Sequence, residues 1–567
     1  MLTYKIDMFF KKSSRSADFY KERLPIRGGR LLLTILLMAS LYASLIFNLY
    51  NLQIKNGKYY GARAASQQQL LGYLRATRGG IYFTDKSGDR IPAAVNKTYP
   101  VIFAVPKEIE DIEESSARLA DMLGLEESKL RLMLGKKNDL YELLIKKASA
   151  EHIDKIQEAA IPGVYVDEEE YRFYPFGALA SQVLGYVGSG SDDKVVGRYG
   201  AESFYQNVLA GKAGKLDGDL LIRSTPGEDL ELTIDRNIQA RAEEILDNLV
   251  QKYSGVGGVV IVEEPKSGKI LAMANHPFFD PNNYSASSIG SFLNQSVSAV
   301  YEPGSIFKII TMASGLDAGR ITPETRFFDS GALTLNGKTI KNWDLKSHGS
   351  VTMTEVIERS INTGVAFAES RLGHENFYNY LVKFGFKEKT GIDLPGEVVG
   401  SLKTLEVNKR DINFATASYG QGVSVTPITL INSFSALANG GVLMRPYLTS
   451  DKAPLIVRRV VSEEAANLVT DMMVSAVKKA KIADISKYTV AGKTGTAQVP
   501  DFKNGGYSHE VINTYMGYAP ATDPRFVILI RLDKPRNAPL AGETVVPAFR
   551  ELAEFILNYY NVAPDRN

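Results

Sequence analysis

The chain of 567 residues contains no cysteine. This absence excludes disulfide bonds, thiol nucleophiles and thiolate metal sites, and it suits a domain that works outside the cytoplasm. Only five histidines are present, and none has the close spacing typical of metal ligands. A metal site is therefore not expected, and no sequence pattern indicates a cofactor.

An excess of charge of one sign is also lacking, because 66 Lys and Arg stand against 64 Asp and Glu, a net charge of +2. No long basic run is interleaved with aromatic residues, so nucleic acid is not an expected partner. No glycine-rich phosphate loop follows a predicted strand, which argues against a nucleotide-binding Rossmann domain. The length nevertheless allows two or more domains with substantial cores.

One long hydrophobic run is present, and residues 31–54 carry no charge. A helix over this run would be about 36 Å long, enough to cross a hydrocarbon core of about 30 Å. Basic residues outnumber acidic ones in residues 1–30, so this tail is predicted to stay in the cytoplasm and the remainder to lie outside. A cleaved signal peptide is the alternative, but the run is longer than a usual signal-peptide core, which favours an uncleaved anchor.

Two regions follow the anchor, a mixed region over 55–225 and a compact domain over 226–562. Residues 109–159 have a helical period, which we interpret as packing within a small helical subdomain rather than as a partner-binding surface. Gly211–Thr225 is rich in glycine and charge, as expected of a link. Strands alternate with helices in the second region, which favours an antiparallel sheet covered by helices. The predicted strands are 230–234, 258–262, 270–274, 514–518 and 526–532, and the predicted helices are 236–251 and 544–560.

The pattern Ser-x-x-Lys occurs three times, and its context selects Ser305 and Lys308. Glu302–Gly304 ends an irregular segment, and an apolar helix then begins, so Ser305 is predicted at a helix N-terminus with Lys308 one turn later on the same face. The helix dipole there favours developing negative charge. The other copies lie in a predicted solvated loop, Ser191–Lys194, and on a charged helix face, Ser475–Lys478. A plain helix cap is the structural alternative for Ser305.

A serine hydroxyl needs a base, and an ordinary lysine is protonated at neutral pH. Lowering its pKa from about 10.4 toward 7 requires roughly 4–5 kcal/mol, which burial and a second cation can supply. Lys493 is the candidate for that second cation. Lys308 is therefore predicted to be the base that activates Ser305.

Ser360-Ile-Asn362 is the only Ser-x-Asn sequence in the chain. It is predicted to project from a loop between two helices. Ser360 is a candidate to pass protons between Lys308 and a leaving amine, and Asn362 is a candidate to bind a substrate amide. Alone, the pair would be ordinary loop residues.

Lys-Thr-Gly occurs twice, at 389–391 and at 493–495. The first copy lies in a predicted turn and is assigned to structure. The second follows a strand-like stretch, where Gly495 would let a substrate backbone approach closely. Lys493, Thr494 and Thr496 are predicted to hold a terminal carboxylate.

In this order and spacing, the motifs at 302–308, 360–362 and 493–496 resemble the active-site triplet of penicillin-binding proteins. Ile306-Phe307 replaces the commoner Thr-Val or Thr-Phe, which leaves the role of Ser305 intact. No glycosyltransferase motif precedes residue 225, so a bifunctional class A enzyme is not expected. Several other stretches resemble the monofunctional class B branch, and the resemblance covers nearly the whole chain: Arg78–Ile81, Arg172–Pro175, Gly200–Glu202, Lys389–Glu397 and Tyr419–Gly422.

The resemblance implies an α/β (α+β) architecture, with a membrane anchor, an elongated pedestal (dimerisation-like) domain and a transpeptidase domain. The latter would have a five-stranded antiparallel sheet between helices. It also implies a peptidoglycan D,D-transpeptidase, in which Ser305 attacks the D-Ala-D-Ala amide of a stem peptide. The backbone N–H groups of Ser305 and Thr496 would form the oxyanion hole, and β-lactams would acylate Ser305. A β-lactam hydrolase or sensor of the same fold and a non-catalytic scaffold are the alternatives.

The resemblance also implies a location and partners. The protein would be a single-pass protein of the bacterial cell (inner) membrane, with its catalytic domain on the periplasmic side. Its partners would be a membrane glycosyltransferase of the SEDS family, FtsW-like, and other divisome proteins. The stretches 302–304 and 541–549 look more like division enzymes of the FtsI type, while elongation and sporulation stay open as alternatives.

Overall fold

The structure, a computed structural model, describes residues 28–50, 76–136, 139–190, 195–217, 220–501, 503–538 and 540–566. The chain divides into two compact units, one with Met1–Gly72 and Pro100–Asp167, the other with Tyr73–Tyr99 and Glu168–Asn567. It passes between them within β2 (Ile91–Ala104) and again within β4 (Val164–Phe173).

The first helix, α1 (Gly28–Tyr50), is long and apolar enough to cross a membrane over Leu33–Tyr50. Its described side chains are exposed, as expected of a helix whose apolar surface needs a lipid environment. The predicted anchor over 31–54 overlaps this helix. Residues 51–54 and most of the predicted cytoplasmic tail, 1–27, lie outside the described residues.

The smaller unit contains the predicted helical subdomain over 109–159. Leu119, Leu123 and Leu130 are buried in its core, and the Asp111 carboxylate caps the first helix by accepting a hydrogen bond from the Glu114 backbone. One strand of this unit, β3, was not predicted from the sequence pattern; it pairs with the end of β2. The elements are α4 (Ile112–Leu123), α5 (Glu127–Leu134), β3 (Glu142–Ile145) and α6 (Ala150–Ala159).

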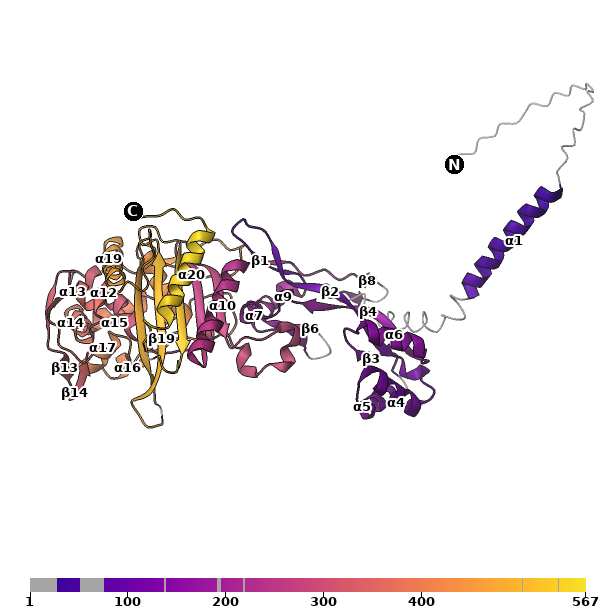
Figure 1. The fold of residues 1–567 in the computed structure, drawn as a ribbon, viewed down its shortest axis with the longest axis horizontal. Helices are drawn as coiled ribbons and strands as arrows, with labels where there is room; N and C mark the ends of the chain where they lie inside the picture. Colours follow the sequence, from indigo (N-terminus) through magenta and orange to yellow (C-terminus); the bar gives the residue numbers. More distant parts are fainter. Residues whose placement is uncertain are drawn as a thin grey trace, which may run out of the picture. The chain divides into compact units, whose positions relative to one another are not determined.

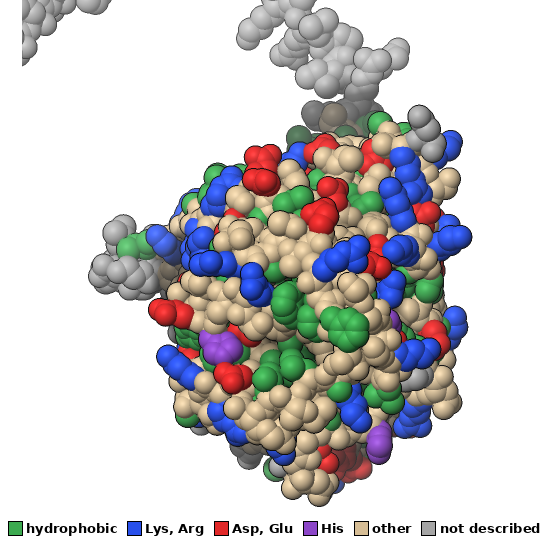
Figure 2. All heavy atoms as spheres, turned by 90° about the vertical axis from the view of Figure 1, so that its left-hand side faces the viewer, with side chains coloured by type: hydrophobic (Ala, Val, Ile, Leu, Met, Phe, Trp, Pro, Cys, Tyr) green, Lys and Arg blue, Asp and Glu red, His purple; other side chains and the backbone are tan. Residues whose placement is uncertain are grey.

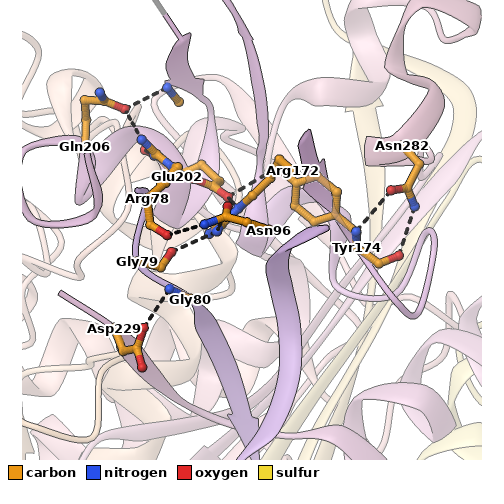
Figure 3. A network of polar contacts seen from close by, with 11 residues as sticks. Arg78, Gly79, Gly80, Asn96, Arg172, Tyr174, Glu202, Gln206, Asp229 and Asn282 are labelled. Carbon is orange, nitrogen blue, oxygen red and sulfur yellow. Dashed lines mark hydrogen bonds and ion pairs between the residues drawn. The ribbon is translucent and has the colours of Figure 1, made fainter. Parts of the chain in front are cut away.

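A buried ion-pair network joins three separate stretches of the larger unit (Figure 3). The Glu202 carboxylate accepts from Arg78 Nε and from Arg172 Nε, each at 2.7 Å. The three side chains are at most 8% exposed. Arg172 also donates to the Gly79 carbonyl, and Arg78 donates to Gln206. Three of the sequence motifs that resemble class B enzymes therefore meet at one carboxylate.

Replacing Glu202 with glutamine should destabilise the larger unit by about 3 kcal/mol, because two buried guanidinium groups lose their counter-charge. The change in the free energy of unfolding is measured by urea titration of the full chain. Glu170→Gln is the matched control, since Glu170 is exposed and its replacement should change stability by less than about 0.5 kcal/mol. Equal unfolding midpoints for the two variants would contradict this prediction.

The larger unit is built around a five-stranded sheet in the order β11-β10-β20-β19-β18, with every neighbouring pair antiparallel. The predicted sheet is thus confirmed. Successive residues of each strand face opposite sides, so Val259 and Ile261 enter one core and Val260 and Val262 the other. The strands are β10 (Gly257–Glu264), β11 (Lys269–His276), β18 (Ala491–Pro500), β19 (Tyr507–Ala519) and β20 (Phe526–Asp533).

Helices cover both faces of this sheet. On one face α10 (Arg236–Tyr253) and α20 (Val545–Tyr559) pack together (Figure 1), and the Asp235 carboxylate caps α10 as predicted. The other face carries the large apolar core that buries the helix after Ser305. Its helices include α12 (Lys308–Asp317), α13 (Met353–Glu358), α14 (Asn362–Leu372), α15 (His374–Lys383), α18 (Pro427–Ala438) and α19 (Glu463–Ala480).

Smaller elements complete the larger unit. Near its start, β1 pairs antiparallel with β2 and parallel with β9. Two short antiparallel pairs, β12 with β15 and β13 with β14, precede α13. Their bounds are β1 (Ile81–Thr84), β9 (Leu230–Asp235), β12 (Arg326–Asp329), β13 (Ala332–Leu335), β14 (Lys338–Lys341) and β15 (Gly349–Thr352). The remaining bounds are α7 (Ser181–Leu184), β5 (Tyr186–Ser189), β6 (Val195–Arg198), α8 (Gly200–Phe204), α9 (Gln206–Leu209), β7 (Lys215–Asp217), β8 (Leu220–Ile222), α11 (Gln295–Ser298), α16 (Lys403–Val407), α17 (Asp411–Ala417), β16 (Val442–Met444) and β17 (Ile456–Arg459).

Candidate active site

Ser305 lies in a short 3-10 turn, η6 (Gly304–Phe307), that leads directly into α12. Gly304 has φ +56°, and its N–H donates to the Gly420 carbonyl at 3.1 Å. A Cβ atom at residue 304 would lie 3.0 Å from the Ala497 Cβ, so glycine permits both the turn and the contact with β18. This turn places Ser305 beside the edge strand of the sheet.

Lys308 is fully buried, and its side-chain nitrogen lies close to three oxygen atoms. Nζ donates to the Ser360 carbonyl at 2.6 Å and to Asn362 Oδ1 at 2.7 Å, and it lies 3.1 Å from Ser360 Oγ. Burial first, and the nearby charge of Lys493 second, lower the pKa of Lys308 well below its ordinary value. A neutral amine has two N–H groups, which the two stronger contacts occupy, so its lone pair is left to accept a hydroxyl proton.

Ser360 lies in the turn between α13 and α14 with φ +55°. This conformation is unfavourable for a residue other than glycine, and it accompanies the short contact of the Ser360 carbonyl with Lys308. The Ser360 hydroxyl lies 3.0 Å from Lys493 Nζ as well as 3.1 Å from Lys308 Nζ. Ser360 is therefore placed to transfer a proton between the two amines.

Lys493 lies on β18 and is also buried. Burial lowers its pKa to about 7, and Nζ donates to the Thr494 carbonyl at 3.0 Å. Because β18 is an edge strand, its outward backbone groups are not used by the sheet. A Cβ atom at Gly495 would lie 2.8 Å from Ile306 Cγ1, so glycine lets this strand approach the turn that carries the serine.

The structure brings the predicted site residues into one region. The expected direct contact between Lys308 and Ser305 is not among its hydrogen bonds in the described residues. Lys308, Ser360, Asn362 and Lys493 form a continuous hydrogen-bonded group. The Ser305 hydroxyl has no hydrogen-bond partner within the described part of the chain, so Lys308 bonds to the Ser360 turn and not directly to Ser305. Of the remaining residues, Thr494 is half-buried, Gly495 faces η6, and the exposed Thr496 accepts from the Ala541 N–H.

The rejected motif copies have other roles or fall outside the described residues. The Lys389–Gly391 copy is not in a strand, and Thr390 donates to the Glu397 carboxylate. The Ser475 hydroxyl, on α19, donates to the Glu358 carboxylate at the end of α13. The Ser191–Lys194 copy lies outside the described residues.

One carboxylate in the stretch before Ser305 makes contacts that the sequence did not indicate. Glu302 accepts from the Gly422 N–H and from the Tyr507 hydroxyl, both at 3.0 Å. It thereby ties the turn before Ser305 to the Tyr419–Gly422 motif and to the start of β19. Burial raises the pKa of Glu302.

A cavity of about 620 Å³ is lined in part by α14. It is lined mainly by apolar side chains, with Glu369, His374 and Asp411 at one side. Figure 2 shows the end of the molecule that bears these elements, where hydrophobic side chains gather among scattered acidic and basic ones. Thr363 is the cavity residue next to the Ser360–Asn362 motif, and none of the predicted site residues lines this cavity.

Models of known protein families match two stretches of this chain. The family model described as penicillin binding protein transpeptidase domain matches residues 258–554. The model described as penicillin-binding protein dimerisation domain matches residues 73–219. The predicted domain limits, 55–225 and 226–562, stay predictions.

Two relatives and one solved structure illustrate the similarity. Stage V sporulation protein D of Bacillus subtilis is 34% identical over 516 residues, which cover 85% of this chain and 78% of the relative. Peptidoglycan D,D-transpeptidase FtsI of Escherichia coli is 27% identical over 579 residues, covering 98% and 95%. The crystal structure of penicillin binding protein 2X from Streptococcus thermophilus aligns with a TM-score of 0.71 at 21% identity, covering 86% and 81% of the chains, and shows the shared fold.

Proposed function

Because this chain belongs to the class B penicillin-binding proteins, we propose that it is a peptidoglycan D,D-transpeptidase that acts through a serine ester on Ser305. The observation that carries the proposal is the hydrogen-bonded group of Lys308, Ser360 and Lys493, in which Lys308 lies one turn after that serine. Such a group can remove a proton from a hydroxyl and return it to an amine without any metal or cofactor.

In the first half of the reaction, the Ser305 oxygen would attack the carbonyl carbon of the D-Ala-D-Ala amide while Lys308 accepts the hydroxyl proton. The backbone N–H groups of Ser305 and Thr496 would bind the negative oxygen of the tetrahedral intermediate. The C–N bond then breaks, and Ser360 transfers a proton from the amines to the departing D-alanine nitrogen. A serine ester and free D-alanine result.

Lys493, Thr494 and Thr496 would hold the terminal carboxylate of the donor peptide. A lysine with a pKa of about 7 can take up a proton when an anion enters, so its charge would be created where the carboxylate binds. Gly495 would leave space for the peptide backbone along the edge of β18, and Asn362 would bind a peptide amide. Departure of D-alanine removes that carboxylate and leaves this end of the site open.

In the second half, an amine of a neighbouring stem peptide would attack the ester and release Ser305. This step distinguishes a cross-linking enzyme from a β-lactam hydrolase or sensor. The full-length protein is acylated with a fluorescent penicillin, freed of excess reagent and followed over time. We expect the ester to persist for many minutes, whereas a donor peptide thioester in the presence of an acceptor amine should yield a cross-linked product. Rapid loss of the penicillin ester without any transfer to the amine would contradict the proposal.

The apolar helix α1 would anchor the protein in the bacterial cell membrane as a single span. With its basic tail in the cytoplasm, the catalytic domain would be on the periplasmic side, where peptidoglycan is cross-linked. The anchor and pedestal would contact a membrane glycosyltransferase of the SEDS family, FtsW-like, together with other divisome proteins.

Septal wall synthesis during division is the physiological role that we propose. The similarity to FtsI and the sequence stretches shared with division enzymes support it. The similarity to Stage V sporulation protein D supports a second candidate, wall synthesis during sporulation. Depletion during vegetative growth separates the two, because only a division enzyme should be needed to prevent filamentation.

A further inference from the structure

The last residue of β14 and the first two residues after it contact the Ser360–Asn362 turn and its neighbours. None of the sequence motifs includes these residues. Each contact is a hydrogen bond to the turn or to the residue at either side of it. Asn362 Nδ2 donates to the Lys341 carbonyl at 2.8 Å. Asn342 Oδ1 accepts from the backbone N–H groups of Asn362 at 3.1 Å and of Thr363 at 3.3 Å. Trp343 Nε1 donates to the Arg359 carbonyl at 3.0 Å.

Helix α14 has no capping side chain of its own. Its N-cap residue is Ile361, which has no hydrogen-bonding side chain, and the first N–H groups of a helix need acceptors from elsewhere. Asn342 Oδ1 supplies that acceptor for Asn362 and Thr363. An asparagine from a separate loop therefore does the work that a serine or asparagine normally does at the N-cap position.

A buried carboxylate fixes the orientation of this asparagine. Asp329, at the end of β12, is fully buried, and its Oδ2 accepts from Asn342 Nδ2 at 2.8 Å. Because the amide nitrogen must face the carboxylate, the amide oxygen must face the N–H groups of α14. The other Asp329 oxygen accepts from the Thr363 hydroxyl at 2.7 Å. Although burial raises the pKa of Asp329, these and other hydrogen bonds hold it below its ordinary value, so the acceptor stays ionised.

We propose that Asp329 and Asn342 are positioning residues, which hold the start of α14 so that Asn362 Oδ1 faces the Lys308 amine. Asp329 accepts a hydrogen bond from Asn342, and Asn342 accepts one from the backbone N–H of Asn362. The Asn362 side chain in turn accepts from Lys308 at 2.7 Å. This contact occupies one N–H of the neutral amine and directs its lone pair toward a hydroxyl. The inference rests on the proposed function, because it assigns Lys308 the role of base.

Asn342→Ala tests the proposal in the full-length protein. The acylation rate constant by a penicillin should fall by about tenfold to a hundredfold, because displacement of a catalytic group by an ångström has effects of that size. The penicillin concentration at half-maximal rate should change little. The acid limb of the rate profile should move to lower pH, because the protonated form of Lys308, which also faces Lys493, loses an acceptor. A merely structural role would lower the fraction of protein that can be acylated and leave the rate constant and the pH profile of that fraction unchanged.

Exchanging the Asp329 and Asn342 side chains tests whether their hydrogen bond, once restored in reverse, also restores the acylation rate. Asn342→Asp alone places two carboxylates against each other and should slow acylation. When Asp329→Asn is added, the new amide can donate to the new carboxylate, which still accepts from the N–H groups of α14 and suits the positive end of the helix dipole. The His348 N–H, which donates to Asp329 Oδ2 in the wild type, then faces the new amide nitrogen and loses its acceptor, so the double variant should regain part of the lost rate and be clearly faster than Asn342→Asp. A double variant as slow as the slower single variant would overturn the proposal.

Thr339→Ala is the matched control, since Thr339 is exposed on the same hairpin and bonds only to Thr334. It should acylate like the wild type. The chain has one tryptophan, so the emission of Trp343 reports whether the loop keeps its contact with Arg359 in each variant. A wild-type protein that penicillin cannot acylate would overturn the proposed function itself. Normal acylation of both the wild type and Asn342→Ala would overturn only the positioning role.

Discussion

Ser305→Ala is expected to abolish covalent labelling by a fluorescent penicillin, down to the background of the denatured protein. Two serines of the motifs are candidates for the nucleophile, Ser305 and Ser360, and this variant decides between them. Ser360 is already held between Lys308 and Lys493, which suits a proton carrier. Ser305 has a hydroxyl without a partner in the described residues and lies in the turn that begins a helix and packs against β18. Its oxygen is therefore the one free to bond to carbon.

The measurement is gel fluorescence after labelling, with mass spectrometry of the modified peptide from the wild type. Ser360→Ala is the matched control, because it removes the other hydroxyl and keeps the carbonyl that binds Lys308. It should still be labelled, although more slowly, since only proton transfer is impaired. Labelling of Ser305→Ala at residue 360 would show that the two serines have the opposite roles.

The sheet could be predicted because its strands are defined by local sequence. Val259–Val262 and Val527–Ile530 are apolar on both faces, as buried strands must be when helices cover both sides. Turn chemistry at Pro265–Gly268 also marked the hairpin between β10 and β11. The short strand β3 was missed, since Glu142–Ile145 is too short a run to separate from the surrounding helical pattern.

That Lys308, Ser360 and Lys493 lie together could be predicted from the motifs, but the hydrogen bonds that connect them could not. Spacing along the chain indicates that Lys308 follows Ser305 by one turn; it does not indicate which oxygen the end of a long, flexible side chain will reach. That depends on the positive φ of Ser360, which puts a carbonyl beside the amine. The Asp329–Asn342 pair was missed for a related reason, because contacts between isolated polar residues leave no periodic pattern in a sequence.

Lys308→Ala should slow acylation by about a thousandfold, within the range of effects attributed to a general base. The amine is held by two oxygen atoms, and its pKa lies well below the ordinary value, so its neutral form becomes available at lower pH than that of an ordinary lysine. Acylation should decline as the pH falls through the pKa of the folded protein, because protonation removes the lone pair.

Lys308→Arg separates this role from a simple positive charge. A guanidinium keeps the charge and the donors, yet it does not lose its proton at any pH at which the protein is folded. If Lys308 acts as a base, the arginine variant should be nearly as slow as the alanine variant at every pH. If the residue acts only as a cation that binds the substrate, arginine should retain much of the rate. Lys478→Ala, at a serine-lysine pair on the surface of α19, should leave the rate unchanged. Stopped-flow acylation across pH 5–9 therefore tests the central chemical claim, that burial has turned a lysine into the proton acceptor for Ser305.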